Sequence, residues 1–320
     1  MKKFISSILI ALSIIYSLTA CSAEQTPEAK QPTEITNSNA ADASKTLPTV
    51  DRANNQITVP EEINTIITMA PSIAEVLVDI GYGDKIIAAD TQSKNIEGLP
   101  ANIPYIDMMA PDAEQIIALK PDVIFASTMS LVDGNDPFKQ LIDMGICVVY
   151  IPSSDSIEGI YEDIMFISNV MESNEKGQVL VDNMKTKIEE IKKISSTIED
   201  KKSVYFEIAA APSLYSFGTD VFLNEMIDII GAKNVLSDQK SWIAVSEEAI
   251  LAANPDVIIT NVNYIEKPVD EILSRNGWDS ITAVKNKNVY YVDNMASSLP
   301  NHHIIKALEE MAGFVYPDKY

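Results

Sequence analysis

The stretch that decides the fold is EQIIALKPDVIFAS at Glu114–Ser127, because a near-copy, EAILAANPDVIITN, occupies Glu248–Asn261. Seven of the first eleven positions are identical, including the leading glutamate and the Pro-Asp-Val-Ile run. Each copy has the pattern of a short helix that enters an apolar strand. The repeat predicts two similar α/β lobes, one around each copy. The alternative is coincidence, since Pro-Asp-Val-Ile is a common entry into a strand.

The sequence around the repeat alternates between two patterns. Strand-like runs alternate with helical patterns over residues 56–171 and again over 203–314, which is typical of a mostly parallel sheet covered on both faces. Between them, about 25 residues keep helical spacing, enough for a helix of about 38 Å. We therefore predict an α/β fold of two Rossmann-like lobes with mostly parallel sheets, joined by one long α-helix. The ligand cleft is expected between the lobes, where domains meet.

The N-terminal residues have the composition of a targeting segment. Lys2 and Lys3 precede an apolar run, Phe4–Tyr16, that is too short to span a membrane. The run ends in Leu-Thr-Ala-Cys at Cys21 and resembles the lipobox of bacterial lipoproteins, in which the cysteine thiol is lipidated. The alternative is an ordinary secretion signal that carries a cysteine by chance. A lipidated Cys21 would place the protein at the outer face of the cytoplasmic membrane, in the periplasm if the cell has two membranes.

The domain boundaries follow from these patterns. Residues 22–49 contain almost no large apolar side chain, so they are predicted to form a flexible tether. The predicted order is a lipoprotein signal peptide at 1–20, the lipidated cysteine and tether at 21–49, an N-terminal lobe at 50–172, a linking helix at 173–200 and a C-terminal lobe at 201–320.

Composition excludes several functions. The formal net charge is −22, which disfavours nucleic acid as a partner because phosphate binding needs a basic patch. The sequence has 11 glycines and lacks a Gly-x-Ser-x-Gly elbow, a phosphate-binding glycine loop and a His/Cys metal cluster. We therefore expect a binding protein and not an enzyme. The weaker alternatives are an extracytoplasmic α/β enzyme that depends on histidine and a structural surface lipoprotein.

An ordered set of motifs resembles one known family. NTIITMAPSIAEVLVDIG comes first, then PDAEQIIALKPDVIFAS, GAKNV, a tryptophan before VSEEAILAANPDVII, WDSITAVKNKNVYYVD and finally ALEEMAGFVYP. This order is similar to that of the substrate-binding proteins of ABC importers for iron complexes and cobalamin, over about residues 49–317. The resemblance implies a monomer that works with an ABC permease and its ATPase subunits. It implies no permanently bound cofactor, and a transported small-molecule metal complex: an iron chelate, haem or cobalamin.

The resemblance also assigns a role to the repeated glutamates. In this family one glutamate on each lobe docks into arginines of the permease, and the motif places those residues at Glu114 and Glu248. The alternative is that each carboxylate stabilises a helix N-terminus, an effect of about 0.3–1 kcal/mol.

The family's ligand contacts come from loops that face the cleft. Aromatic and methionine side chains in such loops suit a bulky planar ligand, although Trp242, Met108 and Met109 could equally fill the core. Some haem-binding relatives ligate iron through a methionine at the position of Met109, but their histidine ligand falls at Asn263, so a Met/His haem site is not expected. The motifs place the ligand contacts at Met108, Met109, Thr128, Met129, Tyr215, Trp242, Asn263, Tyr264, Met295 and His302.

The arginines and histidines of the sequence indicate the charge of the ligand and whether a metal site is expected. Arg52 and Arg275 are the only arginines, which favours a neutral or weakly charged ligand, a hydroxamate siderophore, haem or cobalamin, over an anionic catecholate complex. We rank iron complexes above cobalamin on the breadth of the family. His302 and His303 are the only histidines. Because adjacent histidines are not expected to face one ion, we predict a solvated helix start there and no metal ligands.

Overall fold

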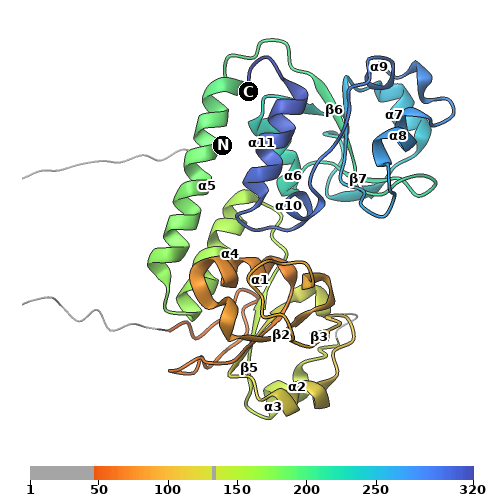
Figure 1. Cartoon of the computed structure of the whole chain (residues 1–320). Coiled ribbons are helices and arrows are strands. Elements are labelled where there is room, and N and C mark those ends of the chain that lie inside the picture. The colour runs from red at the N-terminus through yellow and green to blue at the C-terminus, as the bar shows by residue number, and fades with distance from the viewer. Residues whose placement is uncertain (1–46, 132–134) are drawn as a thin grey trace, which may run out of the picture. The chain divides into compact units, whose positions relative to one another are not determined.

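A computed structural model describes residues 47–131 and 135–320 (Figure 1). Its first lobe is built on a five-stranded sheet of order β3-β2-β1-β4-β5 in which every pair is parallel. The central strands are buried along their whole length because helices cover both faces. The strands are β1 (Ile66–Met69), β2 (Ile86–Asp90), β3 (Tyr105–Ile106), β4 (Val123–Ser127) and β5 (Cys147–Ile151).

The helices of the first lobe follow the strands in alternation. Pro71 opens the first helix directly after β1, and the helical run ends where Gly81 adopts a φ of 91°, a conformation that favours glycine. The long helix after β5 is capped by Ser156, whose hydroxyl accepts the N–H of Gly159. The helices are α1 (Pro71–Leu77), continued by the π-helical turn η1 (Val78–Tyr82), α2 (Ala113–Leu119), α3 (Lys139–Asp143) and α4 (Ile157–Val170).

The second lobe repeats this plan with a smaller sheet. Its parallel strands have the order β11-β10-β6-β8, and an antiparallel pair, β7-β9, lies apart from them. The strands are β6 (Ser203–Glu207), β7 (Tyr215–Phe217), β8 (Lys233–Asn234), β9 (Trp242–Ala244), β10 (Val257–Thr260) and β11 (Val289–Tyr291). The helices are α6 (Phe222–Ile229), α7 (Glu247–Ala253), α8 (Pro268–Leu273), α9 (Thr282–Lys285), α10 (Asn294–Ser298) and α11 (Ile304–Val315).

The repeated sequence forms the same structure twice. The helices α2 and α7 both end on a left-handed residue, Lys120 (φ 53°) and Asn254 (φ 44°), and a Pro-Asp pair follows each. The strand that comes next is internal in both sheets, with β4 between β1 and β5 and β10 between β6 and β11. The prediction of two similar α/β lobes is confirmed.

The aspartate of each Pro-Asp pair ties two strands together. Asp122 accepts the N–H of Thr65 at 2.9 Å, and Asp256 accepts the N–H of Ser203 at 2.8 Å. Hydrogen bonds from the backbone N–H groups of Asn64 and then Thr65 lower the pKa of the Asp122 carboxyl below its usual value. We expect Asp122→Ala to lower the free energy of unfolding by about 1–3 kcal/mol, because partly buried backbone donors lose their acceptor. Urea denaturation measures this, and a loss as large in the exposed variant Asp143→Ala would contradict the assignment.

One long helix, α5 (Asn174–Ser195), joins the lobes as predicted but ends before residue 200. The hydroxyls of Ser195, Ser196 and Thr197 each donate to a carbonyl three residues earlier. These hydroxyls therefore supply donors to carbonyls of the last helical turn, which lacks a full set of intrahelical partners. Within the described ranges, no helix is both long enough and apolar enough to cross a membrane.

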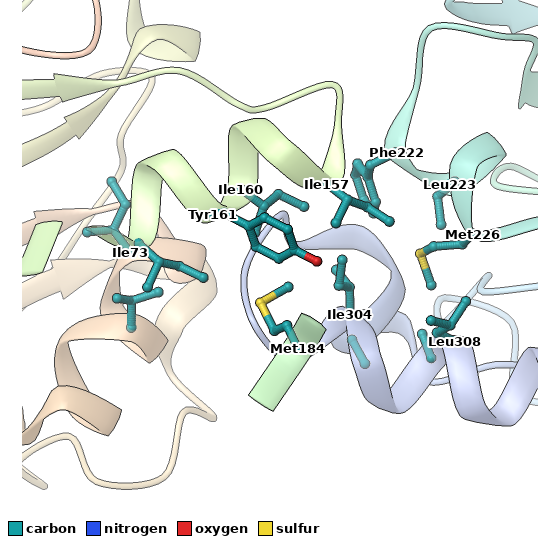
Figure 2. Packing of buried hydrophobic residues seen from close by; sticks show 14 of the residues in the cluster. Ile73, Ile157, Ile160, Tyr161, Met184, Phe222, Leu223, Met226, Ile304 and Leu308 are labelled. Atoms are coloured by element: carbon teal, nitrogen blue, oxygen red, sulfur yellow. The ribbon is translucent and has the colours of Figure 1, made fainter. Parts of the chain in front are cut away.

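Besides the connection through α5, the lobes are joined by one shared apolar core. Figure 2 shows side chains of α4 between a residue of α1 and residues of α6 and α11. The backbone N–H of Ile157 also donates to Glu225 of α6 at 3.0 Å. The described residues, 47–131 and 135–320, accordingly belong to one compact unit. The side chains labelled at this junction are Ile73, Ile157, Ile160, Tyr161, Met184, Phe222, Leu223, Met226, Ile304 and Leu308.

Candidate functional site

In the first lobe, four predicted contact residues lie where strands end. Met108 and Met109 follow β3, and Thr128 and Met129 follow β4. Because parallel strands share one carboxyl edge, all four lie along the same edge of the sheet, where α/β proteins usually bind ligands. Met109 and Met129 are 51% and 59% exposed, whereas Met108 is half-buried against the core. Core filling therefore describes Met108 but not the other two methionines.

In the second lobe, three aromatic contact residues gather around the ends of β6 and β10. Tyr215 lies in β7 and Trp242 in the paired strand β9, where the Trp242 ring packs edge-on against Phe217 with centroids 5.9 Å apart. Tyr264 follows β10, and its hydroxyl accepts the N–H of Ala210 at 2.9 Å. Tyr264 is 67% exposed, so its ring is available to a ligand.

Two further contact residues of this lobe are Asn263, which lines a cavity, and Met295, which belongs to α10. Asn263 lines a cavity of about 560 Å³ together with Lys267, Asp270 and Tyr291. Met295 is half-buried in α10, a helix that the side-chain amide of Asn294 ties to the end of β10. The cavity is large enough for part of a ligand and carries side-chain charges of both signs.

The repeated glutamates occupy equivalent exposed positions. Glu114 is the second residue of α2, and Glu248 is the second residue of α7. The helix N-termini are capped by the preceding residues: Asp112 accepts the N–H of Glu114 at 2.9 Å, and Ser246 accepts that of Ala249 at 3.2 Å. Capping therefore does not require either glutamate. The pKa of Glu248 is lowered by its own backbone N–H and by the Ser246 hydroxyl, which keeps the carboxylate charged.

His302 lies against Asp79 of the first lobe, and the expected solvated helix start is wrong for this residue. Its side chain is only 9% exposed, and its Nε2 lies 2.6 Å from Oδ2 of Asp79. The Nε2 of His303 lies 3.1 Å from the same oxygen. Both rings reach the same oxygen because His303 has helical backbone angles, so that neighbouring side chains diverge by about 100° and not by the 180° of a strand.

Carboxylates beside the histidines change the titration of His303. Asp79 and then Glu75 raise the pKa of His303 to about 9. The two imidazoles hold the pKa of Asp79 well below its usual value. The sequence analysis did not name Asp79, although Glu75 and Asp79 stand four residues apart within a helical pattern, a spacing that places two side chains on one face.

The family follows from comparison with known proteins. The profile of a family described as "Periplasmic binding protein" matches residues 66–296, well over half of the chain. The chain belongs to the periplasmic binding protein family. An uncharacterized ABC transporter substrate-binding lipoprotein, YvrC of Bacillus subtilis strain 168, is 33% identical over 296 residues, 90% of this chain and 92% of YvrC. The predicted resemblance to ABC importer binding proteins is confirmed.

Other periplasmic binding proteins are more distant. A solved structure of a possible iron-binding protein from Staphylococcus epidermidis has a TM-score of 0.71 and 29% identity, and covers 80% of this chain and 100% of its own. The molybdate-binding protein MolA of Haemophilus influenzae is 25% identical over 281 residues, 78% of each chain. A vitamin B12-binding protein of Vibrio campbellii is 24% identical over 249 residues, 77% of this chain and 87% of its own.

Family membership settles the class of activity. Periplasmic binding proteins bind solutes, so this chain is a binding protein of the ABC transporter type and not an enzyme. The predicted signal peptide at 1–20, Cys21 and most of the tether at 21–49 lie outside the described residues.

Proposed function

We propose that this protein is the lipid-anchored, extracytoplasmic component of an ABC importer that captures an iron complex, a siderophore or haem, and delivers it to the permease. The lobes at 50–172 and 201–320 grip the ligand between them, and Cys21 carries the anchor. The observation that carries the proposal is the exposure of Met109, Met129 and Tyr264 at the carboxyl ends of strands in both lobes. Large apolar side chains gathered at such an edge favour a bulky, partly apolar ligand.

The charges of the described residues favour a ligand without strong negative charge. Both arginines are already paired, Arg52 with Asp163 at 2.7 Å and Arg275 with Glu207 at 2.9 Å. Near the contact residues, Lys240 pairs with Asp220 at 3.1 Å. An anionic catecholate complex, or an oxyanion such as the one named for MolA, would find few cations to pair with. Cobalamin is the alternative ligand, and it is the one named for the relative from Vibrio campbellii.

Delivery is proposed to depend on Glu114 and Glu248. Because Asp112 and Ser246 already cap the two helices, the exposed glutamates are available to arginines of a permease. Their equivalent places in two similar lobes suit a permease built from two similar halves.

Tryptophan fluorescence tests the ligand class. The chain has two tryptophans: Trp278 is buried and donates to Glu247, whereas Trp242 is 38% exposed among the contact residues. We expect a ferric hydroxamate or haemin to quench the Trp242 emission at micromolar concentration, and Trp242→Phe to remove most of this change. Calorimetry on the same variant measures the binding that remains.

Each outcome of this titration has one meaning. Quenching by cobalamin alone would support the alternative ligand, and a response to molybdate alone would contradict the charge argument. Absence of both quenching and heat with all four compounds would contradict the proposed ligand classes.

A further inference from the structure

A compact cluster of titratable side chains lies outside the proposed ligand contacts. Glu75 and Asp79 belong to the α1–η1 segment of the first lobe, and His302 and His303 precede α11 of the second lobe. A ligating atom from each of Asp79, His302 and His303 lies within 4.8 Å of the other two. The cluster therefore joins residues separated by more than 200 positions in the sequence.

The two imidazoles converge on a single atom. Both Nε2 atoms face Oδ2 of Asp79, at 2.6 Å and 3.1 Å, and the ring centroids are only 4.1 Å apart. One histidine would be enough for a salt bridge between the lobes. Two imidazole nitrogens and one carboxylate oxygen within 4.8 Å of one another are also ligand types that zinc and similar ions bind. Ligand atoms in a tetrahedral zinc site lie about 3.3 Å apart, so Nε2 of His302 would have to move away from Oδ2 by less than about 1 Å, whereas Nε2 of His303 is already near that spacing.

A further carboxylate orients one of the rings. Oε2 of Glu75 lies 3.3 Å from Nδ1 of His303, and the same carboxylate oxygen accepts a hydrogen bond from the side-chain amide of Asn301. When a metal ion displaces the Nε2 proton, a carboxylate on Nδ1 keeps the remaining proton there and directs the Nε2 lone pair to the ion, as it does in many zinc sites. Nδ1 of His302 has no hydrogen-bond partner among the described residues, so this ring is positioned through Nε2 alone.

We propose that Asp79, His302 and His303 bind a divalent transition-metal ion of the zinc class, with Glu75 as the residue that positions His303. The site is distinct from the ligand contacts at the carboxyl edges of the sheets, and it would not hold the transported complex. Magnesium and calcium are not expected because they prefer all-oxygen ligand sets. By joining η1 to the segment before α11, the ion would stabilise the arrangement of the two lobes.

Metal titration of the mature protein, purified without a histidine tag and treated with a chelator, tests the site. We expect calorimetry to show one Zn²⁺ per chain and an excess of Zn²⁺ to raise the Tm. Asp79→Asn, His302→Gln and His303→Gln should each weaken binding more than about 100-fold, and Glu75→Gln about tenfold. Asp84→Asn is the matched control: it removes an exposed carboxylate five residues from Asp79 and should leave Zn²⁺ affinity unchanged.

A second measurement needs no variant. Since the chain has only two histidines, histidine modification by diethyl pyrocarbonate reports on this cluster alone. We expect Zn²⁺ to slow the modification and Mg²⁺ to leave it unchanged. The proposal is overturned if Zn²⁺ does not protect the histidines, or if the three ligand variants bind Zn²⁺ as tightly as Asp84→Asn does. Neither result bears on capture of the iron complex, which the fluorescence titration tests separately.

Discussion

Replacing Glu114 and Glu248 together by alanine is expected to abolish uptake while ligand binding stays intact. Each carboxylate is exposed near the start of a repeated helix that another residue already caps, so its loss should not disturb the fold. Removing one partner of a charge pair at a protein interface costs about 2–5 kcal/mol, and here two such pairs would be lost. The single variants should fall between the wild type and the double variant.

Transport of radiolabelled ligand by cells, together with fluorescence titration of the purified variant, separates delivery from binding. A control pair, Glu97→Ala with Asp238→Ala, removes one exposed carboxylate from each lobe at positions outside α2 and α7. The control pair should transport normally. Uptake that survives in the Glu114/Glu248 variant, or ligand binding that is lost with it, would refute the docking assignment.

The largest expected loss of stability comes from a buried ion cluster in the second lobe. Arg275 is 6% exposed in its side chain, donates to both oxygens of Glu207 at 2.9 and 3.2 Å, and also binds Glu271. Its guanidinium lies 4.2 Å from the ring centroid of Trp278. We expect Arg275→Met to lower the free energy of unfolding by about 3–5 kcal/mol, because Glu207 would remain buried without its cation.

Removing the unpaired charge of Glu207 should recover part of the lost free energy of unfolding. Burial raises the pKa of Glu207 and Arg275 opposes that shift, so loss of the arginine raises the pKa further. A buried acid with a raised pKa destabilises the fold above that pKa, so the deficit of Arg275→Met should shrink as the pH falls. Adding Glu207→Gln should recover part of the stability at neutral pH. A double variant less stable than Arg275→Met in urea denaturation would contradict this account.

The sequence predicted the parts of the fold that depend on periodicity. The duplicated passage around Glu114 and Glu248, with the strand-helix alternation, was sufficient to predict two parallel sheets and a connecting helix. The early end of α5, where the hydroxyls of Ser195, Ser196 and Thr197 bond to carbonyls of the last turn, is not revealed by the apolar spacing. The contacts between the lobes could not be predicted from periodicity either, since they depend on how two separate helix faces meet.

The candidate site likewise contains residues that can be placed from the sequence and residues that cannot. Residues just after a strand, such as Met129 and Tyr264, can be placed at a sheet edge from sequence because strand ends are predictable. The environment of His302 could not be predicted in this way, because its partner Asp79 comes from the other lobe and no periodic pattern links the two residues. The sequence analysis placed both histidines at a helix start but did not use the angle of about 100° between successive helical side chains, which lets both rings reach one oxygen.

Resemblance between the two lobes does not make them interchangeable modules. Ile157 and Tyr161 of α4 pack in the same apolar cluster as Phe222 of α6 and Leu308 of α11 (Figure 2). Cutting the chain within α5 would leave complementary strips of this cluster facing water on both fragments, which favours aggregation over independent folding. A protein with two visibly duplicated halves should therefore melt in a single cooperative step.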